Sequence, residues 1–219
     1  MSKTQYYYFT EQPYTGYDPA VQEEYPALRL TLPNTLYDPQ IASELYNRYH
    51  DEYQVADEVG FDGIMINEHH TAPFCMQASI NITGAVLAKI TRRAKIVMLG
   101  NPLPLVDNPL RLAEELSMID CISRGRLVSG FVRGGGVESL ANNVNPAHNR
   151  ERFEEAHDLI LAAWTRPGPF PTTRRAAAAS GIHACRTHAL LDFGFRSMTG
   201  VSPRPSAVRM RVSIASHIS

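Results

Sequence analysis

Apolar segments of strand length alternate with longer amphipathic segments along residues 1–170, and this alternation restricts the folds that the chain can adopt. Four expected strands span residues 6–9, 61–67, 94–100 and 126–132. Four expected helices span residues 39–59, 78–89, 109–122 and 150–164. Strands that alternate with helices of a dozen residues are typical of parallel sheets. The sequence therefore predicts an α/β fold, either a doubly wound sheet or a barrel.

The first of these helices carries clear signals at both ends. Asp38 is suited to the N-cap position and Pro39 to the first helical position. Apolar side chains recur on one helical face, at Ile41, Leu45, Tyr49, Tyr53 and Ala56. Gly60 follows the last of them, and glycine commonly ends a helix because it adopts left-handed backbone angles without steric cost. We therefore predict a helix that begins at Pro39, ends at Gly60 and buries this face.

Polar and charged residues follow three of the four expected strands. These residues are Glu68, His69 and His70 after the second strand, Gly100 and Asn101 at the end of the third, and Arg133 after the fourth. Parallel strands bring their carboxyl ends to one edge, where α/β folds bind ligands. Histidine exchanges protons near neutral pH, and arginine beside a glycine-rich loop suits a phosphate or carboxylate. The pattern predicts a site for an anionic cofactor with a proton-handling neighbour.

Simpler interpretations of the same residues remain open at this point. The two histidines suit an exposed loop, Arg133 suits a solvated strand end, and Arg150 suits the exposed first turn of the last helix. Metal binding by residues 68–70 is disfavoured because successive strand residues point to opposite faces. The glycines at 134–136 form neither a dinucleotide-binding motif nor a P-loop, so we interpret them as positions where the backbone approaches a ligand closely.

The composition changes sharply near residue 170. Residues 1–170 carry 14 basic and 21 acidic side chains, whereas residues 171–219 carry seven arginines and one aspartate, so the net charges are −7 and +6. Lysine, glutamate, tyrosine, asparagine and glutamine do not occur after residue 169. Residues 171–219 are either a basic tail that binds an acidic partner or translated sequence without a selected fold, as a reading-frame shift or abnormal splice would produce. We favour the second interpretation because the arginines are scattered, and we divide the chain at residue 170.

Other features bear on location and partners. No apolar stretch reaches the roughly 18 residues that a membrane span needs, and the first residues lack the features of a signal peptide. The three cysteines are widely spaced and odd in number, which fits reduced thiols better than a disulfide framework or a zinc site. We therefore expect a cytoplasmic protein with no metal site and with no membrane or nucleic-acid partner.

Five runs of sequence stand out when residues 5–170 are taken together. They are GFDGIMINEHH at 60–70, LGNPLP at 99–104, DNPLRLAEE at 107–115, ISRGRLVSGFVRG at 122–134 and NRERFEEA at 149–156. In this order and spacing they resemble the bacterial luciferase-like flavin-dependent monooxygenases, and most closely the branch described as limonene monooxygenase-like. The match is specific for the superfamily and much less specific for the substrate.

The resemblance implies a fold and an activity. The fold is a TIM-type (β/α)8 barrel. The activity is that of an FMN-dependent monooxygenase, in which reduced FMN from a separate flavin reductase reacts with molecular oxygen to give a flavin hydroperoxide that oxygenates a small organic substrate. We also expect a homodimer.

The resemblance assigns roles to particular residues. It makes His69 the catalytic histidine, with Glu68 and His70 as its catalytic neighbours. It assigns cofactor contacts to four residues: Gly100 and Asn101 beneath the flavin ring, and Arg133 and Arg150 beside the flavin phosphate. The assignment favours a site over the simpler interpretations of both arginines.

The chain departs from the family because only part of a barrel is recognisable in its sequence. A complete barrel has eight βα units in about 250 residues, whereas four units are recognisable here, before the tail of foreign composition. We therefore expect unpaired sheet edges, dimerisation or aggregation through them, and weak FMN binding. Two alternatives stay open: a non-catalytic half-barrel that binds flavin or an intact subunit, and a deazaflavin-dependent oxidoreductase.

Overall fold

Four parallel strands form the main sheet of the protein, whose computed structural model describes residues 4–168. The strands are β1 (Tyr7–Phe9), β2 (Gly63–Ile66), β3 (Lys95–Met98) and β5 (Leu127–Val128), and they pair in that order. Ile64 of β2, for example, lies opposite Tyr8 on one side and Ile96 on the other. Parallel strands that pair in chain order are those of the first half of a (β/α)8 barrel, so the predicted α/β fold is confirmed. The expected tail at 171–219 lies outside the described residues.

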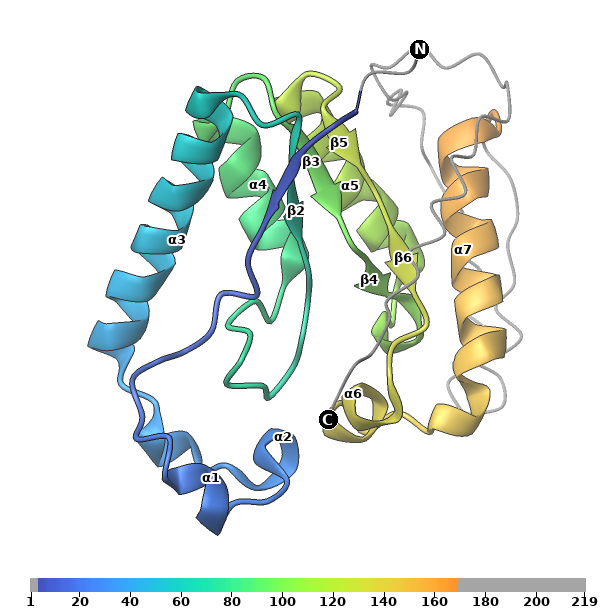
Figure 1. Ribbon diagram of the computed structural model, residues 1–219. Helices are drawn as coiled ribbons and strands as arrows, with labels where there is room; N and C mark the ends of the chain where they lie inside the picture. The colour runs from blue at the N-terminus through green and yellow to red at the C-terminus, as the bar shows by residue number, and fades with distance from the viewer. Residues whose placement is uncertain (1–3, 169–219) are drawn as a thin grey trace.

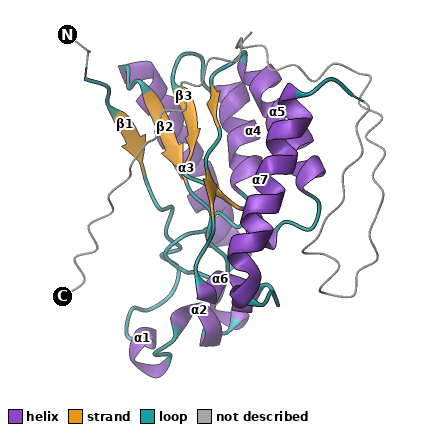
Figure 2. Ribbon diagram, turned by 90° about the vertical axis from the view of Figure 1, so that its right-hand side faces the viewer, coloured by secondary structure: helices purple, strands orange, loops and turns teal. Residues whose placement is uncertain are grey.

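Four long helices connect and follow the strands. They are α3 (Pro39–Val59), α4 (Ile80–Ile90), α5 (Pro109–Ser123) and α7 (Asn149–Thr165). Figures 1 and 2 show them in an arc beside and behind the strands, and each helix contacts the next in the arc. This is the layer order of βα units, in which helices cover one side of a parallel sheet. Among residues 4–168, no helix has both the length and the hydropathy to cross a membrane.

The predicted ends of α3 are confirmed. A side-chain oxygen of Asp38 accepts hydrogen bonds from the backbone N–H groups of Gln40, at 2.7 Å, and Ile41, at 3.4 Å. These bonds satisfy two of the donors that the first helical turn leaves without partners. Gly60 ends the helix with a left-handed φ of 97°. The sequence signals for a helix therefore correspond to actual capping contacts.

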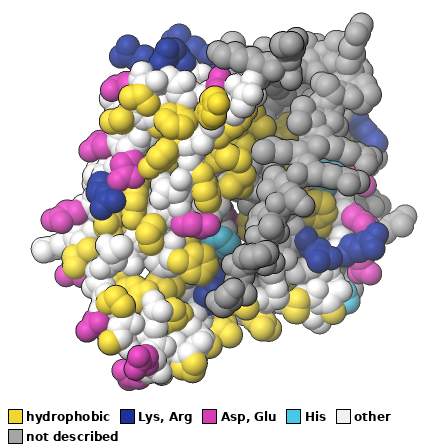
Figure 3. Space-filling model, in the orientation of Figure 1, with side chains coloured by type: hydrophobic (Ala, Val, Ile, Leu, Met, Phe, Trp, Pro, Cys, Tyr) yellow, Lys and Arg dark blue, Asp and Glu magenta, His cyan; other side chains and the backbone are white. Residues whose placement is uncertain are grey.

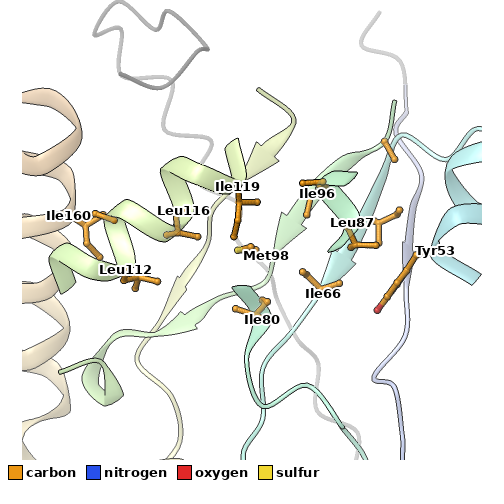
Figure 4. Packing of buried hydrophobic residues seen from close by; sticks show 14 of the residues in the cluster. Tyr53, Ile66, Ile80, Leu87, Ile96, Met98, Leu112, Leu116, Ile119 and Ile160 are labelled. Atoms are coloured by element: carbon orange, nitrogen blue, oxygen red, sulfur yellow. The ribbon is translucent and has the colours of Figure 1, made fainter. Parts of the chain in front are cut away.

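The larger of two buried apolar clusters in residues 4–168 fills the space between the sheet and the helices. Figure 4 shows Ile66, Ile96 and Met98 from the strands against Tyr53, Ile80, Leu87, Leu112, Leu116, Ile119 and Ile160 from the helices. All of these side chains are buried. Burying a large aliphatic side chain contributes roughly 1.5–3 kcal/mol, so this core is the main force that holds the strand ends in place.

The third and fourth expected strands are interrupted, which corrects the prediction of continuous strands over 94–100 and 126–132. A second parallel pair, β4 (Asn101–Pro102) with β6 (Phe131–Val132), follows β3 and β5. From Val97 to Asn101 the chain advances four positions, but its paired strand advances three, from Val128 to Phe131. This extra residue is a bulge, which bends a strand locally.

Two glycines make the bend possible. A Cβ on Gly100 would lie 2.4 Å from a Val132 methyl group, and a Cβ on Gly130 would lie 2.3 Å from the Met98 carbonyl oxygen. Both positions therefore exclude any side chain, because the neighbouring strand approaches too closely. The hydrophobic pattern did not reveal the interruption, since apolar residues continue on both sides of Ser129 and Gly130.

Three short helices occur where the sequence predicted only loops. They are α1 (Val21–Glu24) and α2 (Leu28–Thr31), between β1 and α3, and α6 (Gly136–Ala141), after β6. Figure 1 shows all three beyond the carboxyl ends of the strands, and α2 contacts α6. Helices of four to six residues have too little periodicity to be predicted from sequence. They matter because they bring two distant segments together at the rim where a site is expected.

The opposite, amino-terminal end of the sheet is held by a buried carboxylate. The side chain of Asp57, at the end of α3, accepts hydrogen bonds from the backbone N–H groups of Arg92, Arg93 and Ala94 at 2.8, 2.9 and 2.6 Å. Burial alone would raise the pKa of this carboxyl, but the three N–H bonds outweigh it and lower the pKa. Asp57 thus fixes the turn from α4 into β3.

We expect Asp57→Asn to destabilise the fold by about 1–3 kcal/mol at pH 7, because one amide oxygen cannot replace a two-oxygen carboxylate. The folded-state pKa of Asp57 is lowered, so its stabilisation is present above the unfolded value of about 3.9 and is lost as the pH falls through the folded value. Urea titrations between pH 7 and pH 2 should show a weaker acid dependence in the variant. Asp51→Asn, at an exposed position of α3, is the control, and an equal effect of the two substitutions would contradict the assignment.

Candidate active site at the carboxyl ends of the strands

The segments that follow β2 and β6 meet beyond the carboxyl ends of the strands. The first contains Glu68, His69 and His70, and the second runs from Arg133 through the glycines into α6. Figure 3 shows hydrophobic side chains gathered over the front of the molecule and a histidine at the lower edge of this apolar region. An apolar surface with a few polar groups at one edge is typical of ligand sites.

His69 lies between two carboxylates. Its Nδ1 atom is 2.9 Å from Glu138 Oε1, whereas its Nε2 atom is 3.9 Å from Glu11 Oε2. The first distance is a hydrogen bond and the second is not. The imidazole also meets the edge of the Phe74 ring at 5.2 Å between centroids, and 31% of the side chain is exposed. His69 is thus fixed through one ring nitrogen while the other stays accessible.

Glu138 is a buried carboxylate that binds three donors. Besides His69, it accepts a hydrogen bond from the His70 backbone N–H at 3.1 Å and forms an ion pair with Arg29 of α2. Burial opposes ionisation of this carboxyl, but the hydrogen bonds from His69, His70 and Arg29 outweigh it and lower the pKa of Glu138 to about 2. The group is therefore an anion at every pH at which the protein is expected to work.

Glu68 and His70 pair with each other through their side chains. One Glu68 oxygen lies 3.2 Å from His70 Nε2, and the other accepts a hydrogen bond at 2.8 Å from the Ile80 backbone N–H, at the start of α4. The hydrogen bond with Glu68 raises the pKa of His70 against the opposing effect of burial. Both side chains are therefore engaged in holding the β2–α4 segment, whereas the Nε2 atom of His69 makes no hydrogen bond to the described residues.

Arg133 and Arg150 line one open pocket of about 280 Å³. The remaining lining comes from Gly134, Gly136, Pro146, Ala147 and Asn149. Arg150 also pairs with Glu154 one helical turn away, at 2.9 Å, and 80% of its side chain is exposed. Arg133 is exposed and forms no ion pair with the described residues. The structure thus brings together two arginines that are 17 positions apart in the sequence.

Gly100 and Asn101 are buried at the bend between β3 and β4. The Asn101 backbone N–H donates to the Gly130 carbonyl at 3.0 Å, and its side-chain amide lies 3.8 Å from the Met98 sulfur. Neither residue lines the pocket formed by the arginines. Their position beneath the rim is therefore set by the bend in the strands.

The sequence did not predict three residues that complete the rim. Glu11 follows β1, Arg29 belongs to α2, and Glu138 belongs to α6. The one sequence feature that could have drawn attention to Glu138 is its position two residues after the glycine run. A lone glutamate in an expected loop gives no reason to pair it with a histidine 69 positions away, so only the fold reveals the contact.

The arrangement combines a pocket lined by two arginines with a histidine that has one accessible ring nitrogen. Two guanidinium groups and nearby glycine backbone suit a phosphate, which guanidinium binds through directed hydrogen bonds. His69 suits proton transfer, because one ring nitrogen is anchored and the other accessible. Within residues 4–168, no group of three or more histidine, cysteine or acidic side chains is arranged to hold a metal ion.

Comparison with known proteins places this rim in a family context. The family model described as luciferase-like monooxygenase matches residues 32–192. The oxygenase component of a flavin-dependent trigonelline monooxygenase from Acinetobacter baylyi is 33% identical over 130 residues, which are 58% of this chain and 36% of that protein. Limonene 1,2-monooxygenase from Rhodococcus erythropolis is 31% identical over 109 residues, 48% of this chain and 27% of that protein.

The fold of this chain is similar to the folds of solved monooxygenase structures. The oxygenating constituent of 3,6-diketocamphane monooxygenase from Pseudomonas putida, in complex with FMN, superposes with a TM-score of 0.55 at 21% identity, covering 61% of this chain and 38% of that one. Monooxygenase RslO1 from Streptomyces bottropensis gives 0.54 at 26% identity, covering 72% and 46%. The chain spans about a third of the length of these curated relatives. The family match runs past residue 170, and the boundary there stays a prediction.

Proposed function

This chain belongs to the luciferase-like monooxygenase family, and we propose that it is the oxygenase component of an FMN-dependent monooxygenase that acts on a small organic substrate. We further propose that a separate flavin reductase supplies the reduced FMN. The chemistry that reduced FMN supplies when bound is two-electron activation of molecular oxygen, through a flavin hydroperoxide, with one oxygen atom transferred to the substrate and the other released as water.

The observation that carries the proposal is the pocket lined by Arg133 and Arg150. A phosphate dianion fits this lining, because guanidinium groups bind phosphate oxygens and the glycines leave the backbone accessible. The simpler interpretations, a solvated strand end for Arg133 and an exposed first helical turn for Arg150, gave no reason for the two side chains to share a pocket. Their convergence on one pocket, in a chain of this family, supports their role as ligands of the FMN phosphate.

His69 is the residue that we assign to proton handling. Its Nε2 atom makes no hydrogen bond to the described residues, so a substrate or cofactor can reach it. The apolar surface next to the rim supports exclusion of water, which protects reactive oxygen species from side reactions. We regard Glu68 and His70 as residues that support this corner, because their side chains bind each other and α4.

We also propose that the protein forms a homodimer. The outer surfaces of the adjacent helices α4 and α5 expose Ile82, Met118 and Ile122, at 69, 55 and 48%. Exposed apolar groups that lie on neighbouring elements are typical of subunit interfaces.

The phosphate assignment predicts a selective loss of FMN affinity. We expect Arg133→Ala and Arg150→Ala each to weaken FMN binding by roughly tenfold or more, because each removes a charged hydrogen-bond donor to the phosphate. Riboflavin lacks the phosphate, so its affinity should change by less than about twofold on the same reasoning. Calorimetric titration of the full 219-residue chain with both ligands measures the difference.

Arg111→Ala is the matched control for Arg150→Ala. Arg111 forms an exposed pair with Glu115 at 3.0 Å, one turn along α5, as Arg150 does with Glu154 in α7, but it does not line the pocket. Such pairs contribute only about 0.3–0.5 kcal/mol. Equal losses for FMN and riboflavin, or binding of a deazaflavin but not of FMN, would contradict the proposal.

Limonene and trigonelline, after which two relatives are named, are the first trial substrates for oxygenation with a flavin reductase present.

A further inference from the structure

A single buried carboxylate, that of Glu138, joins the segment before α3 to the histidine corner. Its Oε1 atom binds both Arg29 of α2 and His69 Nδ1, and its Oε2 atom accepts the His70 backbone N–H. Glu138 itself is 5% exposed. It is therefore almost fully buried and does not line the pocket of the arginines, so any effect that it has on chemistry must pass through a neighbour.

The three partners of Glu138 determine where the proton of His69 lies. A guanidinium group and a backbone N–H can only donate hydrogen bonds, and an ionised carboxylate can only accept them. The pKa of Glu138, about 2, keeps the carboxylate ionised at neutral pH. The imidazole nitrogen that lies 2.9 Å from this carboxylate must then carry a hydrogen. The other tautomer would place a lone pair of Nδ1 against a negative oxygen.

We propose that Glu138 is a positioning residue that fixes neutral His69 as the tautomer protonated on Nδ1, so that Nε2 keeps the lone pair that accepts a proton. The inference rests on the proposed function in one respect, namely that His69 is the group that handles protons. A histidine whose second nitrogen is bound to a carboxylate is held in one orientation and one tautomer, as is seen where histidine acts as a base or a ligand.

Arg29 has a separable part in this arrangement. It pairs with Glu138, its guanidinium lies 5.6 Å from the centre of the Phe74 ring, and it also contacts the His70 carbonyl at 3.4 Å. These contacts tie α2 to the rim, but none of them involves the His69 ring. Removal of Arg29 therefore loosens the α2 segment and leaves the His69–Glu138 hydrogen bond, whereas removal of the Glu138 charge breaks the bond itself.

The test is the tautomer of His69, read by long-range ¹H–¹⁵N NMR spectra of the full chain at pH 8, with His69→Gln to assign the signals. We expect the Nδ1–H form to predominate in the wild-type chain. Glu138→Gln keeps the size of the side chain but offers one acceptor to three donors, so we expect the ratio of Nδ1–H to Nε2–H forms to fall by roughly tenfold or more. Arg29→Met should change this ratio by less than about twofold, because the bond to Nδ1 remains.

Glu58→Gln, at an exposed position of α3, is the control and should leave the ratio unchanged. A wild-type chain in which Nε2–H predominates overturns the proposal, and this result does not depend on whether any variant folds. An equal change in Glu138→Gln and Arg29→Met also overturns it, because a purely structural cluster would respond to the loss of either partner. The expected tautomers in a chain that oxygenates no substrate would support this inference and contradict the proposed function.

Discussion

Replacement of His69 with alanine is expected to lower the yield of oxygenated product by about 100-fold or more, the usual contribution of a positioned proton donor or acceptor. The reason is that His69 is anchored through Nδ1, while its Nε2 atom makes no hydrogen bond to the described residues. Loss of the imidazole leaves the pocket of the two arginines intact. FMN affinity should therefore change little while product formation collapses, and oxygen consumption should be diverted to hydrogen peroxide. Product, peroxide and FMN binding are measured with a flavin reductase and a trial substrate that the wild-type chain oxidises.

His70→Ala is the matched comparison for this experiment, because it removes the adjacent imidazole. The Nε2 atom of His70 is already 3.2 Å from Glu68, so it is less available for proton transfer. We expect its substitution to lower product formation by no more than about tenfold, through loss of support for the β2–α4 segment. Similar losses in the two variants, or a His69→Ala chain that keeps its product yield, would show that His69 has no special role.

The largest expected effect on stability comes from Arg126→Ala, at the end of the sheet far from the candidate site. The Arg126 guanidinium donates to the carbonyl oxygens of Ala88, Thr91, Ala94 and Ser123 at 3.1, 3.0, 2.8 and 2.9 Å, and to Thr91 Oγ1 at 2.7 Å. It thereby ties the end of α4 to the end of α5. Truncation leaves several buried acceptors without a donor, and each such group costs about 1–3 kcal/mol. We expect the free energy of unfolding to fall by about 3 kcal/mol or more.

Arg48→Ala measures the contribution of an ordinary arginine. Arg48 pairs with Glu52 on the surface of α3 at 2.8 Å, and exposed ion pairs of this kind contribute little to stability. Arg126→Lys should recover a small part of the lost stability, because a single ammonium cannot reproduce the planar fork. Urea denaturation midpoints compare the three variants, and a loss at Arg126 no larger than that at Arg48 would contradict the assignment.

These two expectations concern opposite ends of the sheet, and the division has a physical basis. Asp57 and Arg126 bind backbone groups at the amino-terminal end, where they close turns between elements. His69 and the two arginines lie at the carboxyl end, where the connecting segments diverge and leave room for a ligand. In α/β barrels, residues at the first end serve stability and residues at the second serve chemistry.

The sequence predicted the elements well where local physics decides them. Asp38 and Gly60 bound α3 as expected, because capping depends on neighbouring residues only. The breaks between β3 and β4 and between β5 and β6 were missed, because they depend on the close approach of Gly130 to Met98. That contact joins residues 32 positions apart, and no local pattern encodes it.

The candidate site shows the same limit. His69 and Arg133 could be proposed from the sequence because they follow expected strands, whereas Arg150 was proposed only through the family resemblance. The partner of His69 could not be proposed, because Glu138 reaches it only after α6 has turned back toward the β2 segment. The pairing of Glu68 with His70 was also hidden, although these residues are two positions apart, since a strand end gives no rule for how the chain bends.

The central claim is that the arginine pocket and the histidine corner form one flavin site. The most direct test is an NMR titration of the ¹⁵N-labelled chain with FMN, with riboflavin as the comparison. We predict that FMN shifts the signals of the Arg133–Gly134 segment and of the His69 side chain together, at one affinity, whereas riboflavin shifts His69 and leaves the arginine segment unchanged. If FMN shifts only one of the two groups, or shifts neither, the two clusters do not belong to one flavin site.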